Sequence, residues 1–237
     1  MQQENGFKTW FYNIPPFTRT YLVILLLTGF GSAYGLFDPF TLVFSRELIL
    51  KRLEVWRLFS NFFYIGGPSM SFVMNLMFIM SFGSSFEKNP MSCAAGDAAD
   101  FIFNVLWGVV LNLLVAFVYP SYLLSMPLLQ YCIYLWSKQN PSTPRSFWGI
   151  TVKGFYMPFV LMAFSLLVGS SIVENIIGIL TGHIFYYFSQ VCEATKNTPL
   201  FTTPAALRRL LSLPTATSKE DEVFKRRWGG SGHHMLV

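Results

Sequence analysis

The stretch Phe101–Tyr119, FIFNVLWGVVLNLLVAFVY, decides the class of this protein, because its 19 residues include no charged side chain. A helix needs about 17 to 25 apolar residues to cross the hydrocarbon core of a bilayer. Of the 237 residues, 53% are apolar, 18% aromatic and only 12% charged, whereas a soluble domain carries about 25% charged residues. So few charges cannot cover a water-exposed surface, and the sequence therefore predicts an integral membrane protein.

Five further apolar segments lie on either side of this stretch. Together they predict an all-α membrane protein, a bundle of six helices with spans at 17–37, 69–86, 101–119, 122–136, 155–170 and 171–190. The fourth span is short, since 15 residues at about 1.5 Å each reach roughly 22 Å against a core of about 30 Å. We expect this helix to thin the bilayer around it, at a modest cost per Å of mismatch.

Lysine and arginine residues are concentrated on one side of the predicted spans. They occur before the first span, in the second and fourth loops and seven times in the tail, whereas the third and fifth loops have none. The positive-inside rule therefore places both termini in the cytosol. This predicts a cytosolic segment at 1–16, a membrane domain at 17–190 and a flexible cytosolic tail at 191–237. A cleaved signal peptide around Leu22–Leu27 is the alternative interpretation of the first span.

The first loop, at about 38–68, carries basic residues on the predicted far side of the membrane. It also holds many apolar side chains, namely Phe44, Leu48, Ile49, Leu53, Trp56, Phe59 and Phe63. This mixture is typical of an amphipathic helix that lies in the membrane interface. Within the loop, Trp56-Arg57 places an aromatic ring beside a guanidinium, a pair suited to anchoring at headgroup depth.

Polar side chains occur inside the predicted spans. They are Asn75, Asn104, Asn112, Gln130, Glu174, Asn175 and His183. Two interpretations stay open, namely hydrogen bonds between helices and a hydrated cavity within the bundle. In the sixth span, Gly178-x-x-x-Gly182 places two glycines on one helix face, where another backbone can approach closely.

The sequence predicts no metal site, no cofactor and no nucleic-acid partner. Cys93, Cys132 and Cys192 lie far apart, without the spacing of a disulfide framework or a zinc site. The net charge of +5 comes from loops and tails, which indicates membrane topology rather than binding to nucleic acid.

Several motifs resemble those of the derlin family. In chain order they are Ile14-Pro15-Pro16-Phe17-Thr18-Arg19, Trp56-Arg57, Asn75-Leu76 with Glu87, Ser146-Phe147-Trp148, Tyr156-Met157-Pro158 and Gly178-x-x-x-Gly182-His183. The match runs from about Trp10 to Pro214, and derlins are pseudoproteases of the rhomboid superfamily. The resemblance implies a rhomboid-like fold in the endoplasmic reticulum membrane. It also implies a non-enzymatic role in moving misfolded proteins to the cytosol for degradation, with a membrane ubiquitin ligase complex as partner.

Two other classes of function remain as alternatives. An active rhomboid protease needs a serine in a GxSG turn of the fourth span and a histidine from the sixth. The fourth span offers only Ser121, Ser125 and Ser137, none between glycines. The literal GxSG at Gly229–Gly232 lies in the polar tail, where no shielded site can form. A small-solute transporter would be expected to show inverted repeats, and none is recognisable.

The end of the tail, at 228–236, resembles the SHP box that docks on the AAA ATPase valosin-containing protein. Trp228, Gly230, Gly232 and Met235 hold the four positions of that motif, with tryptophan in place of the commoner phenylalanine. Glycines permit an extended backbone to pair closely with a partner, and the two apolar side chains can fill pockets. The alternative is a glycine-rich flexible terminus.

Overall fold

The computed structural model describes residues 6–91, 97–119, 123–147, 150–169, 171–191 and 203–211. The chain divides into two compact units, Met1–Thr202 and Thr203–Val237. The first unit is mostly helical, as the sequence predicts. The described part of the second unit forms one helix, α12 (Ala205–Leu211).

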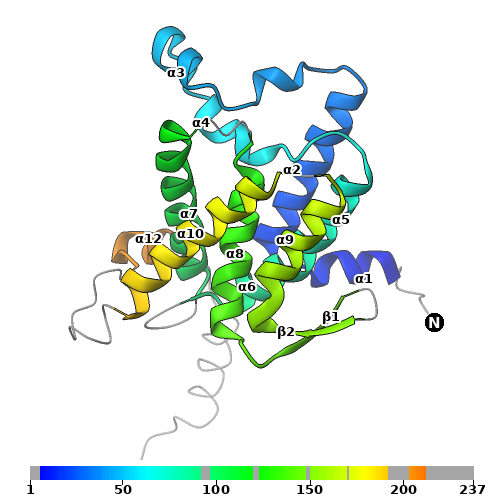
Figure 1. Ribbon diagram of the computed structural model, residues 1–237, viewed down its shortest axis with the longest axis vertical. Coiled ribbons are helices and arrows are strands. Elements are labelled where there is room, and N and C mark those ends of the chain that lie inside the picture. Colours follow the sequence, from blue (N-terminus) through cyan, green and yellow to red (C-terminus); the bar gives the residue numbers. More distant parts are fainter. Residues whose placement is uncertain are drawn as a thin grey trace, which may run out of the picture. The chain divides into compact units, whose positions relative to one another are not determined.

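Helices lie over all six predicted segments (Figure 1). They are α2 (Pro16–Ala33), α5 (Met70–Phe78) with the π-helical turn η3 (Ile79–Gly83) and α6 (Ser84–Lys88), α7 (Ala98–Val118), α8 (Ser125–Gln139), η4 (Gly154–Tyr156) with α9 (Met157–Leu167), and α10 (Ile172–Tyr186) with η5 (Tyr187–Val191). Among the described residues, α7 alone is both long and apolar enough to be identified as a membrane span from length and hydropathy. Six crossings therefore stay a prediction.

Helix α7 turns its small and polar residues inward. Its buried face repeats every four residues, at Asp100, Asn104, Gly108, Asn112 and Ala116. Its exposed face carries large apolar side chains, namely Leu106, Val110, Leu114 and Val118. A surface helix of a soluble protein has the opposite arrangement, so the exterior of α7 suits hydrocarbon rather than water.

Helix α8 lies at the centre of the bundle, between α7, α9 and α10 (Figure 1). Ten of its 15 residues are buried. Tyr131, Ile133 and Leu135 are fully buried and belong to the main hydrophobic core, to which Phe82 and Phe86 contribute from the second helical segment. Neighbouring helices therefore cover most of α8, and thinning of the bilayer by this short helix stays a prediction.

The first loop forms four short helical pieces rather than one amphipathic helix. They are η1 (Pro39–Thr41), α3 (Arg46–Arg52), α4 (Arg57–Ser60) and η2 (Asn61–Phe63). Helix α3 ends at Leu53, whose φ of 57° is left-handed. An L-residue in this conformation cannot continue a right-handed helix, so the chain turns there. Several apolar side chains of the loop, including Leu50, Val55 and Phe59, are exposed.

Two further elements differ from the sequence-based expectations. Helix α1 (Gly6–Asn13) lies within the segment assigned to the cytosolic N-terminus. An antiparallel pair of strands, β1 (Pro144–Phe147) and β2 (Ile150–Lys153), follows α8 and corrects the all-α class. Pro141 and Pro144 explain the change, because proline is excluded from a helix interior and permits extended backbone.

Glu87, near the end of α6, binds the first turn of α2. Its carboxylate accepts the backbone N–H groups of Phe17 and Thr18 at 3.0 and 2.7 Å, and the Thr18 hydroxyl at 2.7 Å. The first N–H groups of a helix lack partners within it, and a negative charge is favourable there. The residue before the helix is Pro15, which supplies no side-chain cap. Glu87 therefore caps α2 from another helix.

Replacing Glu87 with alanine tests this cap. Glu87→Ala removes the acceptor of three hydrogen bonds and should lower the free energy of unfolding by about 2 kcal/mol. The measurement is the melting temperature of the detergent-solubilised protein. The control is Glu47→Ala, because Glu47 pairs with Lys51 at 3.6 Å on an exposed surface, where ion pairs contribute little. Equal stability of the two variants would contradict the capping role.

Candidate functional site

Arg57 is buried and binds three residues of the first loop. Its Nε donates a hydrogen bond of 2.6 Å to the carboxylate of Glu54. Its Nη1 donates to the backbone carbonyl groups of Phe40 and Val43. Only 7% of Arg57 is exposed, and a guanidinium is suited to this role because it presents several donors in a fixed plane.

Trp56, the neighbour of Arg57, lies on the outside of the loop and is 55% exposed. The two predicted residues therefore face different surroundings, since Arg57 joins the loop internally while the indole ring is available to the exterior. The loop lines a cavity of about 590 Å³, and the lining residues include Asp38, Phe44 and Arg57. Bracing of the loop by this pair stays a prediction.

Substitution of Arg57 should loosen the loop. Arg57→Ala leaves the Glu54 carboxylate and two carbonyl groups without their donor, and breaking such a buried pair costs about 3 kcal/mol. We expect thermolysin to cleave the segment 38–57 at least about tenfold faster than in the wild-type protein. Arg52→Ala, which changes an exposed arginine of the same loop, is the control. Unchanged cleavage of Arg57→Ala would refute the bracing role.

Gly178 and Gly182 face α8. A Cβ atom on Gly178 would collide with the carbonyl oxygen of Pro127 and would lie 2.6 Å from Cβ of Gln130. A Cβ atom on Gly182 would lie 2.9 Å from the ring of Tyr134. The contacts advance along both helices together, so α8 and α10 run in the same direction.

The two glycines should differ in their tolerance of a methyl group. Gly178→Ala meets backbone, which cannot move aside, whereas Gly182→Ala meets a side chain. We expect Gly178→Ala to lower the yield of folded protein more, with an overpacking cost of about 1 to 3 kcal/mol. Size-exclusion chromatography of the purified protein measures the yield. Gly67→Ala, with open space around the new methyl group, is the control, and equal yields of all three variants would contradict this packing.

His183 makes a contact that the sequence did not reveal. Its Nδ1 lies 2.7 Å from the hydroxyl of Tyr134 on α8, and the two share a hydrogen bond. The ammonium of Lys138 lies over the rings of Tyr134, Phe155 and Tyr186, at 5.3, 5.3 and 5.7 Å. The spacing of Tyr134 and Lys138 already places them on one helix face, but nothing in the sequence pairs them with α10.

The described serines of the fourth helix are engaged with backbone. Ser125 donates to the carbonyl of Tyr64 and Ser137 to that of Tyr134, both at 2.7 Å. Ser125 lies nine residues before Tyr134, which corresponds to about 13 Å along a helix. Within the described part of the chain, no serine is hydrogen-bonded to His183.

The buried polar residues of the spans are bonded to neighbouring elements. Asn104 donates to the carbonyl of Met91 and Gln130 to that of Pro158, both at 2.7 Å. The Thr181 hydroxyl lies 3.4 Å from Oδ1 of Asn112. Of the two interpretations left open by the sequence, these contacts favour hydrogen bonding between segments over a hydrated cavity.

Part of the predicted site lies outside the described residues. This holds for Trp228, Gly230, Gly232 and Met235 of the tail, and for Cys93 and Cys192. Cys132, on α8, is a free cysteine. In the described ranges no group of three or more histidine, cysteine, aspartate or glutamate residues is placed to hold a metal ion.

The geometry defines a mostly helical protein whose parallel fourth and sixth helical segments are joined through two glycines, with a lipid-compatible exterior on α7. The Der1-like family model matches residues 14–205. Derlin-1 of Arabidopsis thaliana is 31% identical over 207 residues, which cover 85% of this chain and 76% of the relative. Derlin-2.2 of the same plant is 29% identical, covering 91% and 93%. Derlin-1.2 of Zea mays is 28% identical, covering 86% and 84%.

The chain therefore belongs to the Der1-like family, the derlins, and the resemblance seen in the motifs is confirmed. Family membership supports a role in degradation associated with the endoplasmic reticulum. It also supports association with the membrane of that compartment.

Proposed function

We propose that this chain is a non-enzymatic retrotranslocation factor. It crosses the endoplasmic reticulum membrane six times with both termini in the cytosol, thins the membrane locally and recruits a AAA ATPase of the valosin-containing-protein type. The observation that carries the proposal is the family match over residues 14–205. Misfolded proteins are its clients, and a membrane ubiquitin ligase complex is its partner.

Two features support the arrangement of six spans. The exposed face of α7 is apolar while its buried face is polar, which suits a helix surrounded by lipid. Helices α8 and α10 run in the same direction, since Gly178 lies beside Pro127 and Gly182 beside Tyr134. The fourth and sixth spans of a serial bundle must share one direction, so this contact agrees with the proposed topology.

Helix α9 is the element best suited to thin the bilayer. With the preceding turn η4 it forms one apolar helix, Gly154–Leu167, in which Met157, Pro158 and Leu161 are buried. At about 1.5 Å per residue this helix extends only about 21 Å. Its exposed side chains include Phe159, Leu166 and Leu167. A lipid-facing helix much shorter than the hydrocarbon core draws the headgroups inward, which lowers the barrier to polar segments of a client.

The positions of Ser125 and His183 support a pseudoprotease rather than a protease. Nucleophilic catalysis requires a serine within hydrogen-bonding reach of its base. Here Ser125 is bonded to backbone, about 13 Å along α8 from Tyr134, the residue that contacts His183. Without a catalytic step the chain supplies no energy of its own, so the pulling force comes from the ATPase bound to the tail.

A cycloheximide chase of a misfolded reporter of the endoplasmic reticulum tests the function. Cells lacking the protein receive the wild type, Trp228→Ala or a variant with four leucines inserted after Leu166 of α9. We expect the wild type to restore rapid turnover. Trp228→Ala should fail because the ATPase no longer binds, and the lengthened α9 should slow turnover because the bilayer is no longer thinned.

Matched variants separate these effects. Ser218→Ala changes the tail outside the ATPase motif, and insertion of Gly-Ser-Gly-Ser after Leu166 adds length without an apolar helix. Both should support turnover. Normal turnover with Trp228→Ala, together with unchanged co-purification of the ATPase, would refute the role of the tail. Failure of correctly inserted wild-type protein to restore turnover would refute the degradation role itself.

A further inference from the structure

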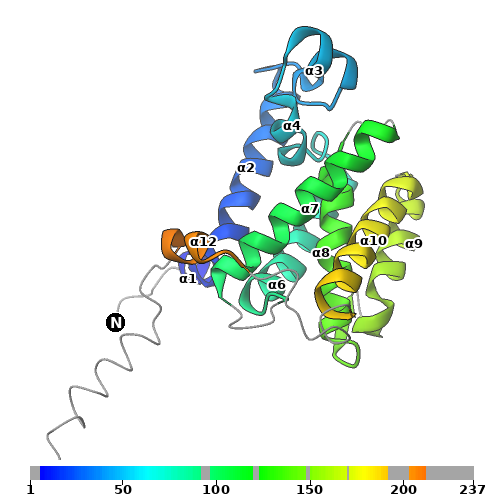
Figure 2. The same ribbon diagram turned by 90° about the vertical axis from the view of Figure 1, so that its left-hand side faces the viewer.

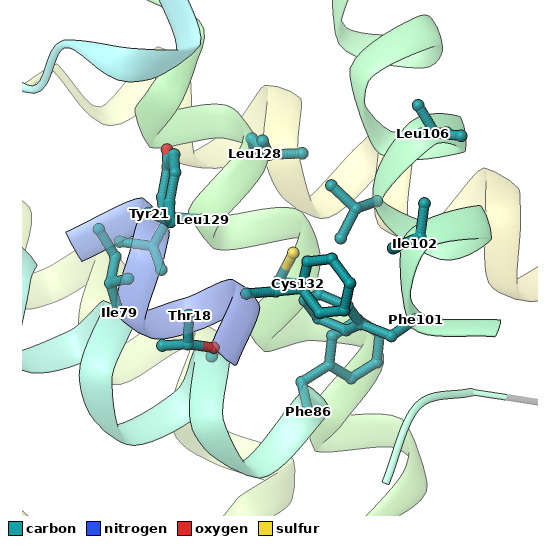
Figure 3. Close-up of a pocket in the computed structure, with 13 residues that line it drawn as sticks. Thr18, Tyr21, Ile79, Phe86, Phe101, Ile102, Leu106, Leu128, Leu129 and Cys132 are labelled. Atoms are coloured by element: carbon teal, nitrogen blue, oxygen red, sulfur yellow. The ribbon is translucent and has the colours of Figure 1, made fainter. Parts of the chain in front are cut away.

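An apolar cavity of about 230 Å³ lies within the bundle, between α2 and α7 (Figure 3). Thr18 and Tyr21 of α2 line one side, and Ile102 and Leu106 of α7 line the other. Cys132 and its neighbours on α8 form the floor. The rings of Phe17 and Phe101, with centroids 6.0 Å apart, bring the two helices together near their first turns.

The polar groups of the cavity wall are already satisfied within the protein. The Thr18 hydroxyl donates to Glu87 at 2.7 Å. The Tyr21 hydroxyl donates to the carbonyl of Phe62 at 2.7 Å. The remaining lining is aliphatic and aromatic apart from the thiol of Cys132. The cavity therefore offers a ligand dispersion contacts and almost no hydrogen-bonding partners, so water gains nothing by entering it.

The size of the cavity limits which apolar molecules can occupy it. A transmembrane helix is at least about 10 Å wide, and one turn of it fills more than about 400 Å³. A cavity of about 150 Å³ holds benzene, so this one holds roughly nine carbon atoms in a row. That matches a segment of a single acyl chain and excludes a client helix or a helix of a second copy.

The position of the cavity opening indicates which kind of molecule occupies the cavity. Leu106, on the wall formed by α7, is 49% exposed, so the opening faces the same surroundings as the lipid-compatible side of that helix. An empty opening would forfeit the dispersion contacts of its walls. We propose that the cavity is a binding site for one acyl chain of a membrane phospholipid, which enters from the side between α2 and α7. The bound chain fills the wedge between these helices.

A photoreactive lipid tests this site. The full chain is reconstituted in nanodiscs of phosphatidylcholine, a fraction of which carries a diazirine in the middle of one acyl chain, and labelled peptides are mapped by mass spectrometry after irradiation. We expect labelling of Leu129 and Cys132, which lie on the floor of the cavity. Val105→Trp places an indole in the cavity and should reduce this labelling at least about fivefold. Ile102→Trp serves as a second filling variant if Val105→Trp does not fold.

Leu114→Trp is the matched control, since Leu114 lies on the exposed face of α7 and does not line the cavity. It should leave labelling of Leu129 and Cys132 unchanged. Labelling confined to the exterior of α7 would show annular lipid only and would overturn the proposal. Labelling of the cavity floor that persists in both filling variants, with their melting temperatures unchanged, would also overturn it.

Discussion

The close approach of α8 and α10 is the constraint on which the rest of the bundle depends. With a Cβ atom at Gly178 the two backbones could not meet at Pro127. Gly108 of α7 makes a similar close contact with α8, where a Cβ atom would lie 2.6 Å from the ring of Tyr131. Small residues thus hold α7 and α10 against one central helix, as expected where lipid provides no hydrophobic drive for association.

The sequence predicts the positions of the helices well, because long apolar segments without charge can adopt few other structures in a membrane. It cannot predict that α8 is mostly buried while α9 is exposed, because both segments are apolar. Composition does not show which helices contact one another. The same limit applies to His183 and Tyr134, which are 49 residues apart. The break at Leu53 was equally hidden, because leucine favours helix and gives no local signal of a left-handed turn.

Different parts of the protein make different kinds of contact. Helix α8 packs closely against α10 at the two glycines, and Arg57 binds Glu54 and two carbonyl groups of the first loop. The short helix α9 carries exposed apolar side chains. Polar side chains inside the bundle form hydrogen bonds with neighbouring segments, such as that from Gln130 to the carbonyl of Pro158.

The cap on α2 has a consequence for the order in which the protein is assembled. Glu87 lies 70 residues after Phe17, so the ribosome completes the first helix well before its cap is made. Until then the first turn of that helix lacks the carboxylate that accepts its N–H groups in the folded protein. The first two helical segments become a finished unit only when Glu87 leaves the ribosome. The contact between the first turn of α2 and α6 therefore cannot form until the chain has been synthesised beyond Glu87.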